Sequence, residues 1–460
     1  MKGCNLWSYS PYRPFLIDVG DIYVCRLAPT SSSIHLEWLS DTEGKFEIYY
    51  RSRGEGDFIK AGETYEHQFD IKGLECDCDF ELYVRCGEVK SRIRLARVGE
   101  GVGVTVNYLH PDDECYKFSG RYICSPSMVK HPDGYLLASM DLYAQAHPQN
   151  LTLIFRSDDD GESWYYQCEL MPCFWGKLFI HRGEIYMLAC STEYGDLLIS
   201  KSTDGAKTFS APVSILRGTN GKLGNVGVHK NQQNPVIYNG RLYHTIEWGS
   251  WGNRDFPYRH AAMVISCDID ADLLNPESWH ITPPVIYNPD WEGVTKEGEV
   301  NGNIEGTLVI SPDGKLYNVM RYESDEKKVI AYEVNGEDPD APLTFSHVIS
   351  FPANRSKFMI KRDERSGLYY SVATRRIDEP RTRRNLLSLM VSRDLAEWNV
   401  VCDLIDRRNS DPEKIGFQYV DFEFDGEDII YLCRTAINGA NSFHDSNYIT
   451  FHRIKNFRNI

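Results

Sequence analysis

The sequence predicts an all-β protein in which a six-bladed β-propeller follows a small β-sandwich. Two observations lead to this fold class. A turn glycine followed by apolar residues recurs six times beyond residue 130, and short alternating segments fill the first hundred residues. A repeat that returns after about 50 to 75 residues has the length of four short strands with their loops, which is one propeller blade.

The alternating segments come first along the chain. Ile34 to Trp38, Phe46 to Arg51 and Phe80 to Arg85 alternate apolar and polar residues, with turn residues between them. This period of two predicts the strands of a small antiparallel sandwich. The tryptophan on an early strand, together with Leu74 six residues before Phe80, resembles a fibronectin type III domain, which is an Ig-like fold.

A glycine-rich stretch marks the expected domain boundary. Val98 to Val104 contains three glycines, a composition typical of linkers. We therefore expect a sandwich domain at residues 1–105 and a propeller domain at residues 106–460. With 460 residues and 42% hydrophobic content, the chain is long enough to build both cores.

The propeller repeat has two parts. The turn glycines are Gly134, Gly183, Gly240, Gly314, Gly367 and Gly426. About 20 to 25 residues after a turn glycine come Ser157 to Trp164 and Ser202 to Phe209, with a weaker copy at Ser392 to Trp398 and an interrupted one at Ser266 to Trp279. In each hairpin we expect the Asp and Ser side chains to bond the turn backbone and the aromatic residue to fill the space between sheets.

These hairpins resemble the Asp boxes, or BNR repeats, of sialidases. The resemblance implies a propeller of the sialidase superfamily over residues 106–460. An Asp box is a structural device, so the resemblance places none of its residues in an active site.

The innermost strand of each blade should lie just ahead of each turn glycine and line the axis of the ring. A polar or aromatic residue stands at the start of each of these strands. The six residues expected to converge on the axis are Ser125, Trp175, Gln233, Glu305, Lys357 and Tyr419.

Two of these strands resemble sialidase strands more closely. The segment from Asn303 to Arg321 resembles the family stretch in which a Glu begins one strand and an Arg ends the next, and the segment at Tyr419 resembles the one that carries the nucleophile. The resemblance implies that Tyr419 attacks the anomeric carbon and that Glu305 takes its proton. The structural alternative for Glu305 is that it only forms an ion pair with Arg321 within the sheet and takes no part in catalysis.

The family's acid/base is an Asp on a loop of the first blade. Asp141 is the nearest candidate here and His147 the second, while a turn-capping Asp is the structural alternative for Asp141. His444, in a polar segment before the last strand, is either a substrate or catalytic group or a residue that closes the ring by hydrogen bonding.

Sialidases hold the substrate carboxylate with three arginines. The resemblance implies that Arg321 is the second and Arg384 the third. The first has no match, because Cys124 and Ser125 stand where the family has an arginine. Loss of one bidentate clamp predicts that sialic acid conjugates are poor substrates relative to some other terminal sugar.

The composition excludes several partners. A formal charge of -16 disfavours nucleic acid and anionic membranes, and no apolar run is long enough to span a bilayer. The 13 cysteines are scattered without the spacing of a transition-metal site, although calcium stays open, and we expect no cofactor. Reduced thiols and the absence of an apolar leader predict a cytoplasmic protein, with a processed secreted form as the alternative.

The sequence therefore favours a retaining exo-glycosidase with a tyrosine nucleophile that releases a terminal acidic or related sugar from an oligosaccharide or glycoconjugate. A polysaccharide lyase acting on uronate-containing glycans is the first alternative, in which His444 or His147 is essential and Glu305 is not. A non-catalytic carbohydrate-binding propeller is the second. The sequence leaves the oligomeric state open.

Overall fold

The computed structural model describes residues 22–219, 225–251, 260–295, 303–322, 326–378 and 382–460. Strands dominate these residues, and the helical elements among them are two short 3-10 turns, Pro276–Ser278 and Phe457–Asn459. The expectation of an all-β chain is confirmed. No helix of the described residues is long and apolar enough to cross a membrane.

The N-terminal part of the described chain, residues 22–97, forms two sheets. One sheet has the order β1-β2-β5, and the other has the order β4-β3-β6-β7 with β8 paired to β6. Trp38 is buried on β2 among the apolar side chains of both sheets, as the alternating pattern predicts. The strands are β1 (Ile22–Pro29), β2 (Ser33–Ser40), β3 (Phe46–Ser52), β4 (Ile59–Thr64), β5 (Gln68–Lys72), β6 (Asp79–Cys86), β7 (Val89–Lys90) and β8 (Arg94–Arg97).

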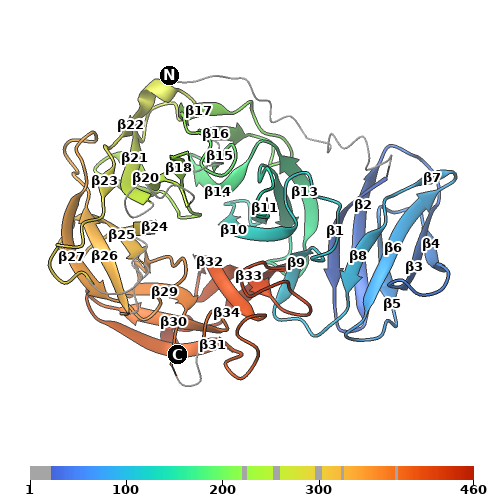
Figure 1. Ribbon diagram of the computed structural model, residues 1–460. Helices are drawn as coiled ribbons and strands as arrows, with labels where there is room; N and C mark the ends of the chain where they lie inside the picture. The colour runs from blue at the N-terminus through green and yellow to red at the C-terminus, as the bar shows by residue number, and fades with distance from the viewer. Residues whose placement is uncertain (1–21, 220–224, 252–259, 296–302, 323–325, 379–381) are drawn as a thin grey trace.

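The rest of the chain forms six sheets in a ring, with the first strand of each near the centre (Figure 1). In the first two sheets, consecutive strands pair antiparallel, and in the third β18 and β19 both pair with β20, while β22 and β23 both pair with β21. The first sheet contains β10 (Tyr122–Lys130), β11 (Leu136–Tyr143), β12 (Thr152–Ser157) and β13 (Tyr165–Leu170); the second β14 (Phe174–His181), β15 (Glu184–Cys190), β16 (Leu197–Ser202) and β17 (Val213–Leu216); the third β18 (Gly227–His229), β19 (Val236–Tyr238), β20 (Arg241–Gly249), β21 (His260–Asp268), β22 (Trp279–Ile281) and β23 (Val285–Ile286).

The last three sheets repeat the order of the first two. The sixth sheet differs in one respect, because its outer strand β9 comes from before the first sheet and pairs with β34. The fourth sheet contains β24 (Asn303–Ile310), β25 (Leu316–Tyr322), β26 (Lys328–Glu333) and β27 (Thr344–Ser350); the fifth β28 (Lys361–Arg362), β29 (Tyr369–Thr374), β30 (Leu386–Ser392) and β31 (Trp398–Asp406); the sixth β32 (Gly416–Asp425), β33 (Asp428–Ala436), β34 (Tyr448–Ile454) and β9 (Val104–Tyr108).

Strand β9 closes the ring, because it joins the start of the ring segment to the end of the chain. It begins at Val104 and crosses the predicted domain boundary between residues 105 and 106. By its pairing with β34, all of β9 belongs to the ring of sheets rather than to the N-terminal pair.

The outer hairpins carry the predicted side-chain bonds. The Ser157 hydroxyl donates to Asp159 and accepts from Gly161 N, while Asp159 also accepts from the backbone and hydroxyl of Ser163. Ser202 and Asp204 repeat this pattern. The aromatic residues that end the four hairpins, Trp164, Phe209, Trp279 and Trp398, pack into the cores between sheets.

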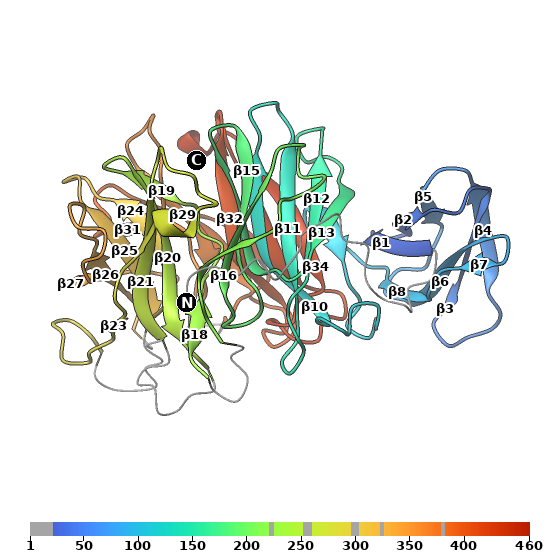
Figure 2. The same ribbon diagram turned by 90° about the horizontal axis from the view of Figure 1, so that it is seen from above.

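The N-terminal pair of sheets lies beside the ring, next to β9 and β13 (Figure 2). Buried polar contacts join the two parts. Arg26 donates to Glu37 at 2.7 Å and to the carbonyl of Val106, and Glu37 accepts from the backbone N of Tyr166 on β13. Because these charged groups are paired, their burial against the ring is compensated.

Candidate functional site

The inner strands share a local distortion at one end. In four of them, a residue other than glycine takes a left-handed backbone directly after a cross-strand pair, and the pairing register then shifts. The left-handed conformation of a residue other than glycine costs about 1 kcal/mol or more of folding free energy, and such residues concentrate at functional sites. The four residues are Ser125 (φ 51), Trp175 (φ 53), Glu305 (φ 56) and Tyr419 (φ 55). We call this end of the inner strands the site end, and the end with the glycine turns the turn end.

Tyr419 and Glu305 meet across the ring. The Tyr419 hydroxyl donates a hydrogen bond of 2.6 Å to Glu305 Oε1. The second carboxylate oxygen, Oε2, lies 2.9 Å from Nε of Arg321, which is the last but one residue of β25 and pairs with Ile304, the residue before Glu305. The expected approach of the two side chains is confirmed, and the guanidinium holds the carboxylate that accepts from the phenol.

Two more arginines surround the phenol ring. The guanidinium of Arg384 lies 5.7 Å from the centre of the Tyr419 ring, and that of Arg434 lies 5.1 Å from it. Arg384 also bonds Gln418 and the carbonyl of Arg355. Arg434 was not expected from the sequence; it stands near the end of β33 opposite Gln418, just as Arg321 stands near the end of β25 opposite Ile304.

The surroundings keep Tyr419 protonated. Burial, with the negative charge of Glu305, raises the pKa of the phenol to about 12, against the opposing effect of Arg321, Arg384 and Arg434. A phenol of this kind stays neutral until a base takes its proton. Glu305 is placed to be that base.

Asp141 lies on the same end of the first sheet, opposite Cys124. Its side chain is completely buried, and the Thr152 hydroxyl donates to its Oδ1 at 2.5 Å. Burial raises its pKa to about 7, while the bond from Thr152 and the charge of Lys230 oppose the rise. A carboxyl with that pKa holds a proton near neutrality, but in this structure no solvent reaches it.

Gln233 and Lys357 lie at the axis of the ring, but their polar side-chain atoms form hydrogen bonds with backbone carbonyls. Gln233 Nε2 donates to the carbonyl of Phe358, and Lys357 Nζ donates to the carbonyls of Gln232 and Val420. Both side chains are buried, and burial lowers the pKa of Lys357 to about 7. In this structure they cross-link facing strands rather than face an open site.

Two further buried lysines, which the sequence analysis did not select, lie at the same depth. Lys177 Nζ lies 2.5 Å from Asp421 Oδ2, with both side chains fully buried. Lys230 donates to the carbonyl of Trp175, and burial lowers its pKa to about 8. These charges fill the axis beneath the site end and tie the inner strands together.

The remaining predicted residues occupy the rim of the site end. Ser125 is buried and donates to Cys124 Sγ at 3.4 Å, whereas Trp175 is half-buried. His444 lies next to Arg434 and bonds Asp445, and burial together with Arg434 lowers its pKa to about 4. His147 donates from Nδ1 to the carbonyl of Gln145 in an exposed loop.

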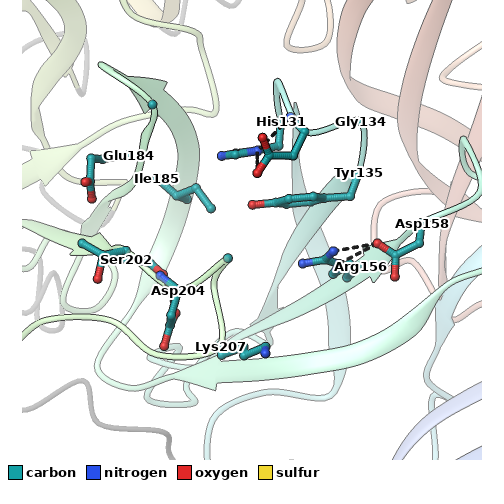
Figure 3. A pocket seen from close by; sticks show the side chains of 14 residues that line it. His131, Gly134, Tyr135, Arg156, Asp158, Glu184, Ile185, Ser202, Asp204 and Lys207 are labelled. Carbon is teal, nitrogen blue, oxygen red and sulfur yellow. Dashed lines mark hydrogen bonds and ion pairs between the residues drawn. The ribbon is translucent and has the colours of Figure 1, made fainter.

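A polar pocket of about 640 Å³ lies at the turn end, between the first two sheets (Figure 3). His131 stacks on Tyr135 with ring centres 4.4 Å apart, and the guanidinium of Arg156 covers the Tyr135 ring at 3.8 Å. The turn at Ser202 and Asp204 lines the same pocket. None of the predicted catalytic or substrate-binding residues lines it.

In the described ranges, no group of three or more His, Cys, Asp or Glu side chains is placed to hold a metal ion. Most of the cysteines in these ranges are buried.

The chain is similar to known proteins in its structure and not in its sequence. No family profile matches the sequence, and no curated protein matches it. The Hadza microbial sialidase Hz136 is similar with a TM-score of 0.52 and 14% identity, over 97% of this chain and 99% of that one. A Penicillium chrysogenum α-L-arabinanase complexed with arabinobiose is similar with a TM-score of 0.50 and 14% identity, over 78% and 98%.

A third similar structure is the GH93 α-L-arabinofuranosidase of Fusarium graminearum in complex with arabinobiose, with a TM-score of 0.50 and 11% identity, over 77% of this chain and 98% of that one. At these identities the likeness shows the fold alone. The chain has the β-propeller fold that these three structures share.

Proposed function

We propose that the protein is a retaining exo-glycosidase that releases a terminal acidic or related sugar from an oligosaccharide or glycoconjugate. The observation that carries the proposal is the 2.6 Å hydrogen bond from the Tyr419 hydroxyl to Glu305. A nucleophile bonded to a base, which is itself held by Arg321, is the arrangement that covalent catalysis requires.

In the first half of the reaction, Glu305 takes the phenol proton while the Tyr419 oxygen attacks the anomeric carbon, and the bond from that carbon to the oxygen of the leaving group breaks as this oxygen receives a proton from a general acid. Because the phenol has a pKa of about 12, it approaches the sugar uncharged. An uncharged nucleophile suits an anomeric centre that bears a carboxylate, since an anionic side chain would be repelled. In the second half, water attacks the same carbon and the phenolate regains its proton from Glu305.

The arginines support an acidic substrate. Arg321 and Arg384 match the second and third clamps of the resemblance, and Arg434 adds a third guanidinium from the sixth sheet. Its charge lowers the pKa of the Cys124 thiol against the rise caused by burial, so Arg434 lies near the position that has no arginine, although it reaches there from the sixth sheet rather than the first. Because Cys124 and Ser125 themselves supply no guanidinium, we keep the proposal that sialic acid conjugates are poorer substrates than another terminal acidic sugar.

We also propose an assignment of the sheets and hairpins to the units of a sialidase-like architecture. We assign the six sheets of the ring as six blades, the Ser and Asp hairpins as Asp boxes, and the N-terminal pair of sheets as a fibronectin III-like sandwich. We place these units at residues 1–105 and 106–460, with β9 as the strand shared across the boundary, and the protein in the cytoplasm.

A panel of aryl glycosides tests the function. The panel should contain a nonulosonic acid, a hexuronic acid and an arabinofuranoside, together with uronate oligosaccharides. Release of the aryl group, with retention at the anomeric carbon, is the expected result for at least one acidic sugar. Ultraviolet absorbance from an unsaturated product would indicate the lyase instead, and binding without turnover would indicate a carbohydrate-binding propeller.

A further inference from the structure

A histidine and a glutamate form a buried pair on the third sheet, beside the site. His229 ends β18 and stands directly opposite Glu247 on β20. His229 Nδ1 shares a hydrogen bond with Glu247 Oε2, and the two residues are 3% and 0% exposed. A carboxylate on one ring nitrogen fixes the tautomer and turns the other nitrogen toward its own partner.

Glu247 is also tied to the strand that carries Glu305. Its Oε1 accepts a hydrogen bond of 3.2 Å from the backbone N of Gly306, the residue after Glu305. A Cβ at position 306 would lie 2.1 Å from Asn318 Oδ1, so only glycine allows this approach. The pair His229 and Glu247 is thus anchored one residue away from the proposed base.

An aromatic wall adjoins His229. The half-buried Trp175 ring lies 4.3 Å from the imidazole, centre to centre, and Trp175 is itself one of the left-handed residues of the site end. The ring of His260 lies 4.8 Å away on the other side. Within the described part of the chain, His229 makes its hydrogen bond through Nδ1, which leaves Nε2 for a further partner.

The proposed reaction lacks one participant. Tyr419 and Glu305 provide the nucleophile and its base, but the departing sugar or alcohol still needs a proton. Asp141 is completely buried with its Oδ1 bonded to Thr152, and the pKa of His444, lowered to about 4, leaves that imidazole without a proton to donate near neutrality. His229 is the titratable group on the neighbouring strand that combines an orienting carboxylate with a ring nitrogen left for another partner.

We propose that His229, oriented by Glu247, is the general acid and base for the leaving group, and that the leaving group stacks on Trp175. This inference rests on the proposed glycosidase function. As the bond from the anomeric carbon to the leaving oxygen breaks, the Nε2 proton of the imidazolium moves to that oxygen, and the Tyr419 oxygen bonds to the carbon. Water later gives one proton back to Nε2, its oxygen bonds to the carbon, and Tyr419 departs with the proton held by Glu305.

The test compares leaving groups. The replacement His229→Gln keeps a polar side chain of similar length but cannot carry the proton. With alkyl or sugar leaving groups we expect turnover to fall roughly 100- to 10,000-fold, because proton donation is then required. With a dinitrophenyl glycoside, whose leaving group needs no proton, formation of the covalent intermediate should be almost unchanged, and added azide should restore its breakdown.

The control is His260→Gln, the same change in a neighbouring buried histidine, for which any effect should be equal for all leaving groups. Glu247→Gln serves as the positioning variant. Loss of the Glu247 carboxylate should leave the imidazole without its orienting partner, so Glu247→Gln should reduce turnover more for alkyl and sugar leaving groups than for dinitrophenyl. His260→Gln should not show that difference.

The outcomes separate the two proposals. If wild-type protein cleaves no glycoside, or if Tyr419→Phe is fully active, the proposed function fails. If wild type is active and Tyr419→Phe is not, equal losses for all leaving groups in His229→Gln, without azide rescue, would overturn the role of His229 alone. Melting temperatures of all variants identify losses due to unfolding.

Discussion

The two ends of the inner strands differ in what their side chains do. At the turn end, side chains bond their own hairpins, as Asp204 does with the backbone and hydroxyl of Thr208. At the site end, left-handed residues interrupt four inner strands, and polar and charged side chains bond one another across sheets, as Tyr419 does with Glu305. Left-handed residues also occur in the turns, at Asp160, Arg182 and Ala206, so the two ends differ in which groups their side chains bond rather than in strain alone.

This contrast predicts different results for substitutions at the two ends. Changes at the site end should reduce turnover with little loss of stability, and changes at the turn end should do the reverse. The following predictions run from the largest expected effect to the smallest.

The largest effect is expected from the pair Tyr419 and Glu305. Tyr419→Phe removes the attacking oxygen but keeps the ring, so turnover should fall by several orders of magnitude, roughly 1,000-fold or more, while the melting temperature stays near that of wild type. Glu305→Gln should cause comparable damage, and the double variant little more, because members of one catalytic unit are not additive. Additive losses, or a lower melting temperature with normal activity of the folded fraction, would identify a purely structural pair.

The next effect concerns Arg434. Arg434→Lys keeps the charge but loses the planar fork, so the KM for an acidic substrate should rise roughly 10- to 100-fold. Arg453→Lys is the matched control, because Arg453 lies on the same sheet but pairs with Asp425 and Asp428 at the turn end. Steady-state kinetics of both variants check this prediction, and equal KM values would contradict it.

The third prediction concerns Asp141 and pH. Its folded pKa of about 7 lies above the unfolded value of about 3.9, so between these values the native state binds more protons than the unfolded state. Stability therefore falls as pH rises through this window, by about 4 kcal/mol at most. Asp141→Asn should lose this dependence, so urea unfolding at pH 4.5 and pH 8 should show the variant gaining on wild type at the higher pH.

The smallest effect is expected at the turn end. Asp204→Asn weakens the bonds to Thr208, so the free energy of unfolding should drop by about 1 kcal/mol. Turnover by the folded protein should not change, because Asp204 lies away from Tyr419. Denaturant unfolding and kinetics on one preparation suffice, and a large loss of turnover would show that the two ends are coupled.

The turn end was predictable from sequence because its chemistry is local. A hairpin that bonds its own backbone needs the same residue types each time, so Ser157 to Trp164 and Ser202 to Phe209 repeat visibly. The weaker copies keep only some of these hydrogen bonds. In the first, Ser392 still accepts a hydrogen bond from Leu395 N. In the interrupted copy, Asp268 accepts from the turn backbone at Asp270 N, and Ser266 accepts from Arg241 instead.

The site end was only partly predictable, because its residues differ from sheet to sheet. Ser125, Trp175, Glu305 and Tyr419 were found by position, while Gln233 and Lys357 lie deeper than expected. Arg434 and Glu247 were missed, although a signal exists. The residue seven places after a turn glycine is Asp141, Glu247 or Arg321 in the first, third and fourth sheets, and Arg434 stands eight places after Gly426.

The covalent intermediate on Tyr419 tests the central claim most directly. The protein should be incubated with a fluorinated glycosyl fluoride of the sugar it cleaves, since the second fluorine slows breakdown of the intermediate. The account predicts an added mass of one fluorosugar on the peptide that contains Tyr419, and none on Tyr419→Phe. Turnover with inversion at the anomeric carbon, or an adduct on another residue, would contradict it.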